Sequence, residues 1–586
     1  MSKTIQRRKP SEKPCQLPAY LHPILAQVYQ RRDIASEEEL SSTLGRLLPY
    51  KNLSGITAAV ALLVRALSER QRILIVGDFD ADGATSSAVA VRALRLLGVA
   101  HVDYLVPNRF EFGYGLTPEI VAVARDKAPD LIVTVDNGIA SIDGVLAARE
   151  AGIDVLITDH HLPGDQLPNA NAIVNPNQAG DVFPSKNLAG VGVIFYLMMA
   201  LRAELRDNGW FEKQGIESPN LAQLLDLVSL GTVADVVKLD DNNRILVAQG
   251  LARIRRGVCC PGVRALAQIS GRDISKLVAS DMGFALAPRL NAAGRLDDMS
   301  LGIECLLTDD EGQALKIAQQ LDDLNRERRD IEAEMKSQAM ELLALEGIGL
   351  DSLEQQNDTL PYGLCLFDES WHQGVIGILA SRIKERLHRP VIVFAPAGKA
   401  ELKGSARSIP GLHIRDVLDT VANRHPGLVA KFGGHAMAAG LSLPAENYAA
   451  FSEAFDTEVR RHLNKDDLNR IVLSDGALDH AYISQDVAEL LRQAGPWGQG
   501  FPEPMFDGSF KIFSQRIVGE KHLKMQLQSA QNTAPIDAIM FNADSVDATE
   551  QGDQVHIAYR LDINDFRGQR KIQLVVEHLS IEGVPD

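Results

Sequence analysis

The stretch Ile73–Asp82, ILIVGDFDAD, decides how this chain folds. Four aliphatic residues followed by a glycine are typical of a strand that is buried on both faces, as in a parallel sheet. Three aspartates follow at alternate positions, Asp78, Asp80 and Asp82. In open α/β sheets, ligand-binding groups collect beyond the carboxyl ends of the strands, so we expect these carboxylates at that edge.

Two further apolar stretches end in the same way. Leu131–Gly138 reads LIVTVDNG, and Val155–His161 reads VLITDHH. If the three strands belong to one parallel sheet, their polar ends converge on one edge. The side chains that would meet there are Asp78, Asp80, Asp82, Asp136, Asp159, His160 and His161.

This convergence of acidic side chains predicts a metal site. Five aspartates so close together repel one another and would have strongly raised pKa values unless a cation lay among them. Oxygen and imidazole ligands without a thiolate disfavour a structural zinc site and suit manganese, magnesium or iron, and we expect two divalent ions, Mn²⁺ or Mg²⁺. A metal pair serves in-line displacement at phosphorus, so phosphoester hydrolysis is the predicted reaction class. For any single aspartate, the alternative is a loop cap.

A helix is predicted directly after the first acidic cluster. Gly83–Ser87, GATSS, leads into an amphipathic pattern that runs to about Leu97. The free N–H groups of its N-terminus would favour an anion at the same place. In this interpretation Thr85 or Ser86 caps the helix.

The acidic motifs resemble those of the DHH phosphoesterase superfamily. They are Asp78-Phe-Asp80-Ala-Asp82-Gly83, Val135-Asp136-Asn137-Gly138, Asp159-His160-His161 and, further on, Leu230-Gly-Thr-Val-Ala-Asp235. Later motifs narrow the resemblance to the RecJ family of bacterial single-strand exonucleases: Pro288-Arg-Leu-Asn-Ala-Ala-Gly-Arg295, Trp371-His-Gln-Gly-Val-Ile-Gly377, Gly404-Ser-Ala-Arg-Ser408 and Gly433-Gly-His435. The resemblance runs from about residue 45 to the C-terminus in unbroken order.

The resemblance implies a role for each residue of the acidic cluster. The implied ligands of the two metal ions, with Asp136 as the bridge, are Asp80, Asp82, Asp136, His160 and Asp235. Asp78 and Asp159 would act beside them, through water or by orienting an imidazole. His161 would face the scissile phosphate. Asp78, Asp159 and His161 are therefore predicted as catalytic residues.

The resemblance also implies the substrate, which is single-stranded DNA degraded from its 5′ end to 5′-mononucleotides in recombination and repair. A pocket for the 5′-terminal phosphate would be formed by Arg109, Arg289, Ser405 and Arg407. Bidentate arginines suit a dianionic terminal phosphate better than an internal diester. Gly434 and His435 would hold the scissile group, and Asn291 and Arg295 complete the substrate-binding set. Without the resemblance, Gly404–Ser408 would be interpreted as a turn and His435 as an incidental loop histidine.

Composition and length set wider bounds. With 586 residues, of which 45% are hydrophobic, the chain is too long for one core and should form several domains. No apolar run approaches the roughly 20 residues that span a bilayer, and the basic, polar N-terminus has no segment of the signal-peptide type. We therefore expect a cytoplasmic protein without a membrane segment. The five cysteines show no CxxC spacing, and their odd number argues against a disulfide framework.

The formal net charge of −17 is unusual for a protein that binds nucleic acid, because nonspecific affinity comes from Lys and Arg neutralising phosphates. The metal-binding aspartates contribute part of this negative charge, and bound cations would offset them. A global sum also says nothing about local basic stripes. The charge therefore does not decide the substrate.

The order of predicted elements gives an α/β chain of several domains. Residues 1–45 are treated as a tail and lead-in whose basic start is disordered, and 46–305 as a DHH domain with a parallel sheet. Gly190-Val-Gly192 suggests a dinucleotide fingerprint, but the third glycine position holds Phe195 and no strand precedes it, so we reject that site. Residues 306–350 form a connecting helix, beginning at Thr308 in capping-box order, and 351–460 form an α/β DHH-associated domain.

The C-terminal residues 461–586 change in character. Alternating apolar positions, as in Val555, Ile557 and Tyr559, predict antiparallel strands with a turn at Asn564–Gly568. Short strands with scattered basic residues fit a small barrel of the OB type, which binds single strands by charge and stacking, although aromatic residues are sparse. The basic residues are Lys511, Arg516, Lys521, Lys524, Arg567, Arg570 and Lys571.

Two other functions compete with this interpretation. The first is a DHH enzyme that acts on oligoribonucleotides, cyclic dinucleotides or pyrophosphate, although such enzymes are shorter and need no C-terminal β module. The second is a scaffold, because a DHH-like subunit of the eukaryotic replicative helicase has lost its metal site; here every expected ligand position is filled. The resemblance to RecJ further implies a monomer that works with single-strand-binding protein and a recombination helicase.

Overall fold

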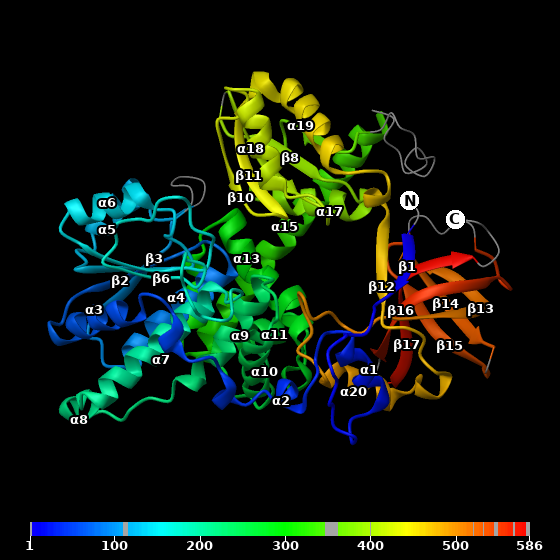
Figure 1. Cartoon of the computed structure of the whole chain (residues 1–586), viewed down its shortest axis with the longest axis horizontal. Helices are drawn as coiled ribbons and strands as arrows, with labels where there is room; N and C mark the ends of the chain where they lie inside the picture. The colour runs from blue at the N-terminus through cyan, green and yellow to red at the C-terminus, as the bar shows by residue number, and fades with distance from the viewer. Residues whose placement is uncertain are drawn as a thin grey trace. The chain divides into compact units, whose positions relative to one another are not determined.

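The computed structural model describes residues 3–108, 115–345, 361–398, 400–519, 521–530, 532–543, 549–566 and 569–581 (Figure 1). The chain divides into two compact units. The parallel-sheet unit comprises Pro10–Arg326 and Leu490–Glu503. The barrel unit comprises Met1–Lys9, Glu327–Glu489 and Pro504–Asp586.

A five-stranded parallel sheet organises the first unit. Its strands, in spatial order, are β3 (Val102–Leu105), β2 (Ile73–Gly77), β4 (Leu131–Val135), β5 (Asp154–Thr158) and β6 (Ala172–Val174). Every residue of β2 and β4 is buried, as their aliphatic sequences predict. The three strands that precede the acidic motifs, β2, β4 and β5, are direct neighbours, so their carboxyl ends meet.

Helices cover both faces of this sheet. In Figure 1, α5 (Pro118–Arg125) and α6 (Ile142–Glu150) lie on one face, and α3 (Ile56–Ser68), α4 (Ala81–Leu96) and α7 (Gly190–Asp207) lie on the other. Apolar side chains of α5 and α6 share one core with those of the three central strands. The predicted α/β architecture with a parallel sheet is confirmed.

The rest of this unit is helical. Its longer helices are α9 (Leu225–Ala234), α10 (Asp241–Arg255), α11 (Pro261–Ile269), α13 (Ala287–Leu296) and α14 (Ser300–Leu307). The predicted long helix is present as α15 (Glu311–Leu345), and the compact units divide within it, between Arg326 and Glu327. The Asp310 carboxylate accepts a hydrogen bond from the Gln313 N–H at 2.6 Å, so Asp310, two residues after Thr308, caps the helix.

The barrel unit contains a mixed sheet of parallel and antiparallel strands. The strands are β10 (Lys431–Gly434), β11 (Ala438–Pro444), β9 (Glu401–Arg407), β8 (Val391–Pro396) and β7 (Leu364–Phe367), in that order. Only β7 and β8 run parallel; the other pairs are antiparallel. Three helices pack with the sheet, α17 (Ile376–Leu387), α18 (Ile414–Arg424) and α19 (Tyr448–His462).

A closed five-stranded barrel follows. Its order is β13 (Phe506–Val518), β14 (His522–Ser529), β15 (Asn532–Met540), β17 (Gln569–Ile581) and β16 (Gln554–Phe566), with β16 pairing back to β13. The alternating apolar residues of β16, including Val555, Ile557 and Tyr559, are buried. The predicted OB-type module is therefore confirmed, while residues 567–568 of the predicted turn lie outside the described residues.

The first residues of the chain are part of the barrel unit. Strand β1 (Lys3–Arg7) pairs in parallel with β12 (Arg470–Ser474). The Arg7 guanidinium donates to Asp507 at 2.7 Å, which fixes this strand to β13. The prediction of a disordered basic tail is thus wrong, because the pairing partner lies more than 460 residues further along the chain.

Hydropathy gives one further result. Among the described residues, no single helix has the length and apolar character needed to cross a membrane, and one bent pair, Leu44–Asn52 with Ile56–Ser68, meets these criteria only when taken together.

Candidate metal centre

The loop between β2 and α4 carries the first three aspartates. Asp80 is the N-cap of α4, and its Oδ1 accepts hydrogen bonds from the N–H groups of Asp82 and Gly83 at 2.9 and 3.0 Å. The helix therefore begins at Ala81, inside the acidic motif. The prediction that Thr85 or Ser86 caps it is wrong, because both are buried within its first turns, where the Thr85 hydroxyl donates to the Ala81 carbonyl at 2.9 Å.

A second helix N-terminus points at Asp82. The N–H of Gly190 donates to Asp82 Oδ2 at 2.6 Å, and the N–H of Val191 donates to Oδ1 at 3.0 Å, both from the start of α7. A side chain at Gly190 would have its Cβ 2.5 Å from the Cβ of Asp136. Sequence reasoning missed this residue. The signal was the Gly-x-Gly pair at the start of an apolar helix, a pattern more readily interpreted as a dinucleotide motif.

Asp136 follows β4 in a strained backbone conformation. Its φ is 61°, in the left-handed region that few residues other than glycine adopt, although aspartate is among those enriched there. Its N–H donates to the Thr158 carbonyl at the end of β5 at 3.1 Å. Such strain persists only where the surrounding structure imposes it, and it is common at functional sites. Here it directs a buried carboxylate to the strand ends.

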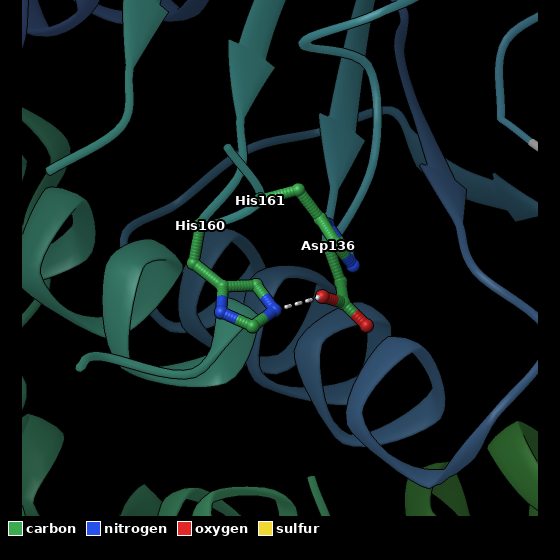
Figure 2. A group of neighbouring side chains, drawn as sticks. All are labelled: Asp136, His160 and His161. Carbon is green, nitrogen blue, oxygen red and sulfur yellow. Dashed lines mark ion pairs between the residues drawn. The ribbon is translucent and has the colours of Figure 1, made fainter. Parts of the chain in front are cut away.

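His160 lies between two carboxylates from different elements. Its Nε2 is 3.1 Å from Asp136 Oδ1 (Figure 2). The same nitrogen is 3.5 Å from Asp235 Oδ2. Asp235 follows α9, whose Gly231 packs so closely that a Cβ there would lie 2.1 Å from the Thr85 hydroxyl. The side-chain amide of Asn177 donates to the His160 carbonyl at 2.5 Å and thereby holds the histidine loop. The fourth motif therefore meets the other three, as the family resemblance implied.

His161 and Asp159 form a separate hydrogen-bonded pair. His161 Nδ1 is 2.7 Å from Asp159 Oδ1, and Asp159 is buried. Burial opposes the charged form of His161, but the hydrogen bond to Asp159 and the surrounding carboxylates outweigh it and raise its pKa to about 9. For Asp159, burial acts in the opposite direction, but the hydrogen bond from His161 and the nearby charges hold its pKa below the ordinary value. At neutral pH this pair is an imidazolium held by a carboxylate.

Three overlapping groups of potential ligands result. They are Asp78, Asp80 and Asp136; Asp82, His160 and Asp235; and Asp136, His160 and His161, each with ligand atoms within 4.8 Å of one another. Asp136 and His160 each belong to two groups. We call the seven residues the metal centre: Asp78, Asp80, Asp82, Asp136, His160, His161 and Asp235.

The metal centre holds more negative charge than the protein neutralises. Burial raises the pKa of Asp82 to about 7, and the neighbouring Asp235 and Asp80 carboxylates add to this shift. Burial and the Asp80 carboxylate raise the pKa of Asp235 to about 8. The pKa of Asp136 lies well above its ordinary value for the same two reasons, burial and the surrounding aspartates. Burial instead lowers the pKa of His160, which keeps this imidazole neutral and able to bind a metal.

These residues fit divalent cations. His160 Nε2 and Asp235 Oδ2 are buried atoms for which the described residues provide no hydrogen bond. Buried polar atoms nearly always have a partner, so these two point to a ligand. Oxygen donors with one or two imidazoles and no thiolate suit Mn²⁺ or Mg²⁺. A cation would remove the carboxylate repulsion that raises the three pKa values.

The substrate-binding residues predicted in the parallel-sheet unit have different environments. Arg109 lies outside the described residues. Arg289 is nearly buried, with Nη2 2.7 Å from Asp322 Oδ1 and Nη1 donating to the Ala285 carbonyl at 2.5 Å. Asn291 Oδ1 accepts the Ala81 N–H at 2.9 Å, so Asn291 contacts the acidic loop of the metal centre. Arg295 is half-buried near the end of α13.

The barrel unit brings two predicted residues together. The Arg407 guanidinium donates from Nη1 to Ser405 Oγ at 3.1 Å and from Nε to Ser381 Oγ at 3.1 Å. A Cβ at Gly377, in the first turn of α17, would lie 2.9 Å from Arg407 Nη2 and 3.0 Å from Ser405 Oγ. Among the described residues no carboxylate pairs with Arg407, and burial lowers its pKa. We call Gly377, Ser381, Ser405 and Arg407 the Arg407 cluster.

Gly434 and His435 lie at a hairpin of the same sheet. Gly434 ends β10 with a φ of 145°, and a Cβ there would lie 2.4 Å from the Ala439 Cα. The His435 N–H donates to the Ala438 carbonyl at 2.8 Å, which closes the turn between β10 and β11. Glycine is therefore required at position 434 by the backbone alone.

Family models match three parts of the chain. The N-terminal domain of the DHH family matches residues 72–232, the DHHA1 domain matches 360–461, and the RecJ OB domain matches 474–578. These matches contain the metal-centre motifs up to Leu230-Gly-Thr, the Arg407 cluster and the barrel.

Curated relatives match over the full length. The chain is 56% identical over 576 residues to the single-stranded-DNA-specific exonuclease RecJ of Dickeya dadantii (strain 3937), covering 98% of both chains. It is 54% identical to the protein of the same name from Escherichia coli (strain K12), covering 99% of this chain and 100% of that protein.

A solved structure has the same fold. The crystal structure of RecJ in complex with Mn²⁺ from Thermus thermophilus superimposes with a TM-score of 0.77 at 31% identity, covering 96% of this chain and 76% of that one. The Mg²⁺ complex of the same protein gives a TM-score of 0.71 at 30% identity. The relatives' names, the three domain matches and the fold agree. This chain belongs to the RecJ family.

Proposed function

We propose that this protein is a metal-dependent exonuclease that degrades single-stranded DNA from its 5′ end and releases 5′-mononucleotides. The observation that carries the proposal is the convergence of four acidic motifs at one edge of a parallel sheet, with His160 Nε2 and Asp235 Oδ2 buried there without a hydrogen bond from the described residues. The identity to relatives named as single-stranded-DNA-specific exonucleases supports the substrate.

Asp80, Asp82, Asp136, His160 and Asp235 would hold two divalent ions, Mn²⁺ or Mg²⁺, with Asp136 shared between them. Its membership of two ligand groups supports the shared role. When bound, such a pair lowers the pKa of water and stabilises charge on phosphate oxygens. The N-termini of α4 and α7 fix two of these carboxylates in place, because their N–H groups donate to Asp80 and Asp82.

Three further residues of the same edge act on the substrate directly or through a neighbour. The hydrogen bond to Asp159 raises the pKa of His161, and in its protonated form the other ring N–H can donate to a phosphate oxygen of the scissile group. Asp159 holds the His161 ring in place through the 2.7 Å hydrogen bond to Nδ1. Asp78, whose Oδ1 accepts the Phe79 N–H at 2.7 Å, orients water beside the ligands.

The 5′ end is recognised by arginines. Arg407, with Ser405, supplies donors for the terminal phosphate, and Gly377 in the first turn of α17 lies close beside them. We propose a phosphate-binding role for Arg109 and Arg289 as well, while Asn291 and Arg295 position the strand. Gly434 and His435 hold the scissile group. A half-buried arginine without a carboxylate partner among the described residues supports an anionic ligand at Arg407.

The barrel binds the strand beyond the 5′ end. Arg516 on β13 lies opposite Lys524 on β14, and Phe513 and Phe541 are about half exposed. Basic residues with exposed rings bind single strands by charge and stacking without reading sequence. This module favours a long strand over a dinucleotide or pyrophosphate as substrate. We further propose a monomer in the cytoplasm that works with single-strand-binding protein and a recombination helicase.

The test is product length against time on single-stranded DNA labelled at its 3′ end, with Mn²⁺, Mg²⁺ or chelator. A ladder that shortens from the 5′ end and disappears with chelator is expected. Immediate release of the 3′ label as a mononucleotide would show that degradation starts at the 3′ end instead. Intact DNA under both metals would contradict the function and make oligoribonucleotides, dinucleotides and pyrophosphate the next substrates to test.

A further inference from the structure

Phe284 is the most exposed aromatic side chain among the described residues of this chain. Its side chain is 85% exposed, and it lies in a short π-helical turn, Met282–Leu286, directly before α13. A single exposed apolar side chain is ordinary. A π-helical turn is rare, however, and such turns are frequently found at functional sites.

This turn packs next to a metal-centre residue. A Cβ at Gly283 would lie 3.4 Å from Val233 Cγ1, and Val233 lies two residues before Asp235. Val236, directly after Asp235, is 63% exposed and has a φ of 60°, which is exceptional for a β-branched residue. Val236 is thus next to Asp235 in sequence, and the turn that carries Phe284 packs against the helix that ends directly before Asp235.

Helix α13 anchors the same turn to the acidic loop. Asn291 accepts the Ala81 N–H at 2.9 Å, and a Cβ at Gly294 would lie 1.8 Å from the Phe79 carbonyl oxygen. Phe284, directly before α13, thus sits on an element that two contacts fix to the loop of Asp78, Asp80 and Asp82. Because this element is held in place, the ring loses little conformational freedom when a ligand binds over it.

We propose that Phe284, supported by Val236, stacks on an unpaired nucleobase of the DNA strand next to the metal centre. The proposal rests on the proposed function and adds a specificity-determining residue to it. Phosphate and sugar give an aromatic ring little to contact, whereas every base has a π-face, so the contact is independent of sequence. Within a duplex, neighbouring base pairs cover those faces. A ring in this position therefore favours single strands over double strands, because only a single strand exposes a base face for stacking. This preference adds to any steric exclusion of a duplex.

The experiment compares normal and abasic oligonucleotides. Strands with a 5′-phosphate and a 3′ fluorophore carry one abasic residue at each of the first four positions in turn. Affinity is measured by anisotropy in chelator, where no cleavage occurs, and kcat/KM is measured with Mn²⁺. The proteins are wild type, Phe284→Ala, Phe284→Trp and, as a matched control, Tyr20→Ala, which removes another ring, 80% exposed, from the same unit.

For wild type, we expect one abasic position to weaken binding roughly 5- to 100-fold, the range for loss of one stacked base. Phe284→Ala should bind normal DNA as weakly as wild type binds that abasic strand, and should lose nothing further on it. Phe284→Trp should retain the discrimination, and Tyr20→Ala should behave as wild type. All variants should melt like wild type, because the side chains removed are exposed.

Unchanged discrimination in Phe284→Ala would overturn the proposal. A lower melting temperature with unchanged discrimination would overturn it too, since the ring would then pack against protein. Failure of the proposed function is a separate result: wild type itself would degrade no single-stranded DNA with either metal.

Discussion

The metal centre and the Arg407 cluster carry opposite charges. In both regions the charge is not balanced by neighbouring protein groups. In the metal centre, buried carboxylates outnumber the cations near them, and burial with mutual repulsion raises the pKa values of Asp82, Asp136 and Asp235. In the Arg407 cluster, a half-buried guanidinium has hydroxyls and a carbonyl as neighbours, and desolvation lowers its pKa. A folded chain retains such uncompensated charge where a ligand of the opposite sign binds. We therefore propose cations as the ligands of the metal centre and a phosphate as the ligand of the Arg407 cluster.

The largest effect should come from removing the shared carboxylate. Asp136→Asn keeps the size of the side chain, and asparagine also tolerates the positive φ at this position, so the fold should persist. Loss of an outer hydrogen-bond partner of a metal ligand costs about 10- to 100-fold, so loss of a ligand itself should lower kcat/KM by about 10³-fold or more. Nuclease assays with Mn²⁺ measure this.

The matched control is Asp226→Asn. Asp226 is also buried with a raised pKa, but its carboxylate accepts backbone N–H groups from Leu227 and Cys260 outside the metal centre. This variant should retain its activity per folded molecule. Equal losses in both variants would mean that any buried aspartate is needed, and the metal-centre side of the comparison would fail.

The next effect should come from a single methyl group at Gly190. In Gly190→Ala the new Cβ would lie 2.5 Å from the Asp136 Cβ and 2.6 Å from its Oδ1, so the carboxylate or the start of α7 must move. We expect a roughly 10- to 100-fold loss of Mn²⁺ affinity, as for other residues that orient ligands. Isothermal titration with Mn²⁺ measures it.

The control for this glycine is Gly152→Ala, in the same unit. Its Cβ would have open space around it, so the new methyl group meets only the backbone strain of a positive φ. Its Mn²⁺ affinity should match that of wild type. Unchanged Mn²⁺ affinity in Gly190→Ala would show that α7 does not set the ligand geometry.

A smaller effect is expected on the cationic side. Arg407→Lys keeps the charge but loses the planar fork that binds two phosphate oxygens. A charged hydrogen bond contributes about 1.5–3 kcal/mol, so kcat/KM on a 5′-phosphorylated strand should fall about 10- to 100-fold. The loss on a 5′-hydroxyl strand should be smaller. The ratio of the two rates, measured on matched oligonucleotides, gives the preference directly.

Arg382→Lys is the control in the same barrel unit. Arg382 lies on α17, is half exposed and pairs with Glu332 at 2.9 Å, so its charge is already compensated. Its substitution should leave the preference for a 5′-phosphate as in wild type. If Arg407→Lys also keeps the full preference for a 5′-phosphate, end recognition does not use this cluster. That result would leave the assignment of the metal centre untouched.

The smallest effect is a pH dependence of stability. A carboxyl group with a raised pKa stabilises the folded state fully below its unfolded pKa, near 3.8, and this stabilisation is lost as pH rises through the folded value. With pKa values of about 7 for Asp82 and about 8 for Asp235, metal-free protein should lose stability as pH rises from about 4 to about 8, by a few degrees in Tm, and change little above that. Mn²⁺ competes with these protons, so the Tm increase caused by Mn²⁺ should grow over the same range. A Tm increase independent of pH would show that Mn²⁺ binds elsewhere.

The sequence predicted the metal centre because two local patterns determine it. Buried aliphatic strands predict a parallel sheet, and polar residues at the strand ends then meet whatever the details of packing. The ligands Asp136 and His160, for example, follow β4 and β5 closely. Asp235 follows a helix, and no strand pattern could place it there; only the family resemblance did.

The parts that were missed depend on contacts distant in sequence. The role of Gly190 arises from the approach of α7 to Asp136, which no local pattern contains. The cap of α4 was misplaced because Asp80 is at once a predicted ligand and the N-cap, while the hydroxyl residues that resemble caps are buried inside the helix. Likewise, the pairing of β1 with β12 and the ion pair between Arg289 and Asp322 join segments that are unrelated in sequence pattern.

The number of Mn²⁺ ions bound per chain, measured by equilibrium dialysis and elemental analysis, shows directly whether the buried carboxylates bind cations. We predict close to two ions in wild type and in Asp226→Asn, and fewer than one in Asp136→Asn, because that carboxylate serves both ions. No bound Mn²⁺ in wild type, or equal binding in wild type and Asp136→Asn, would contradict the assignment of the buried carboxylates to cations.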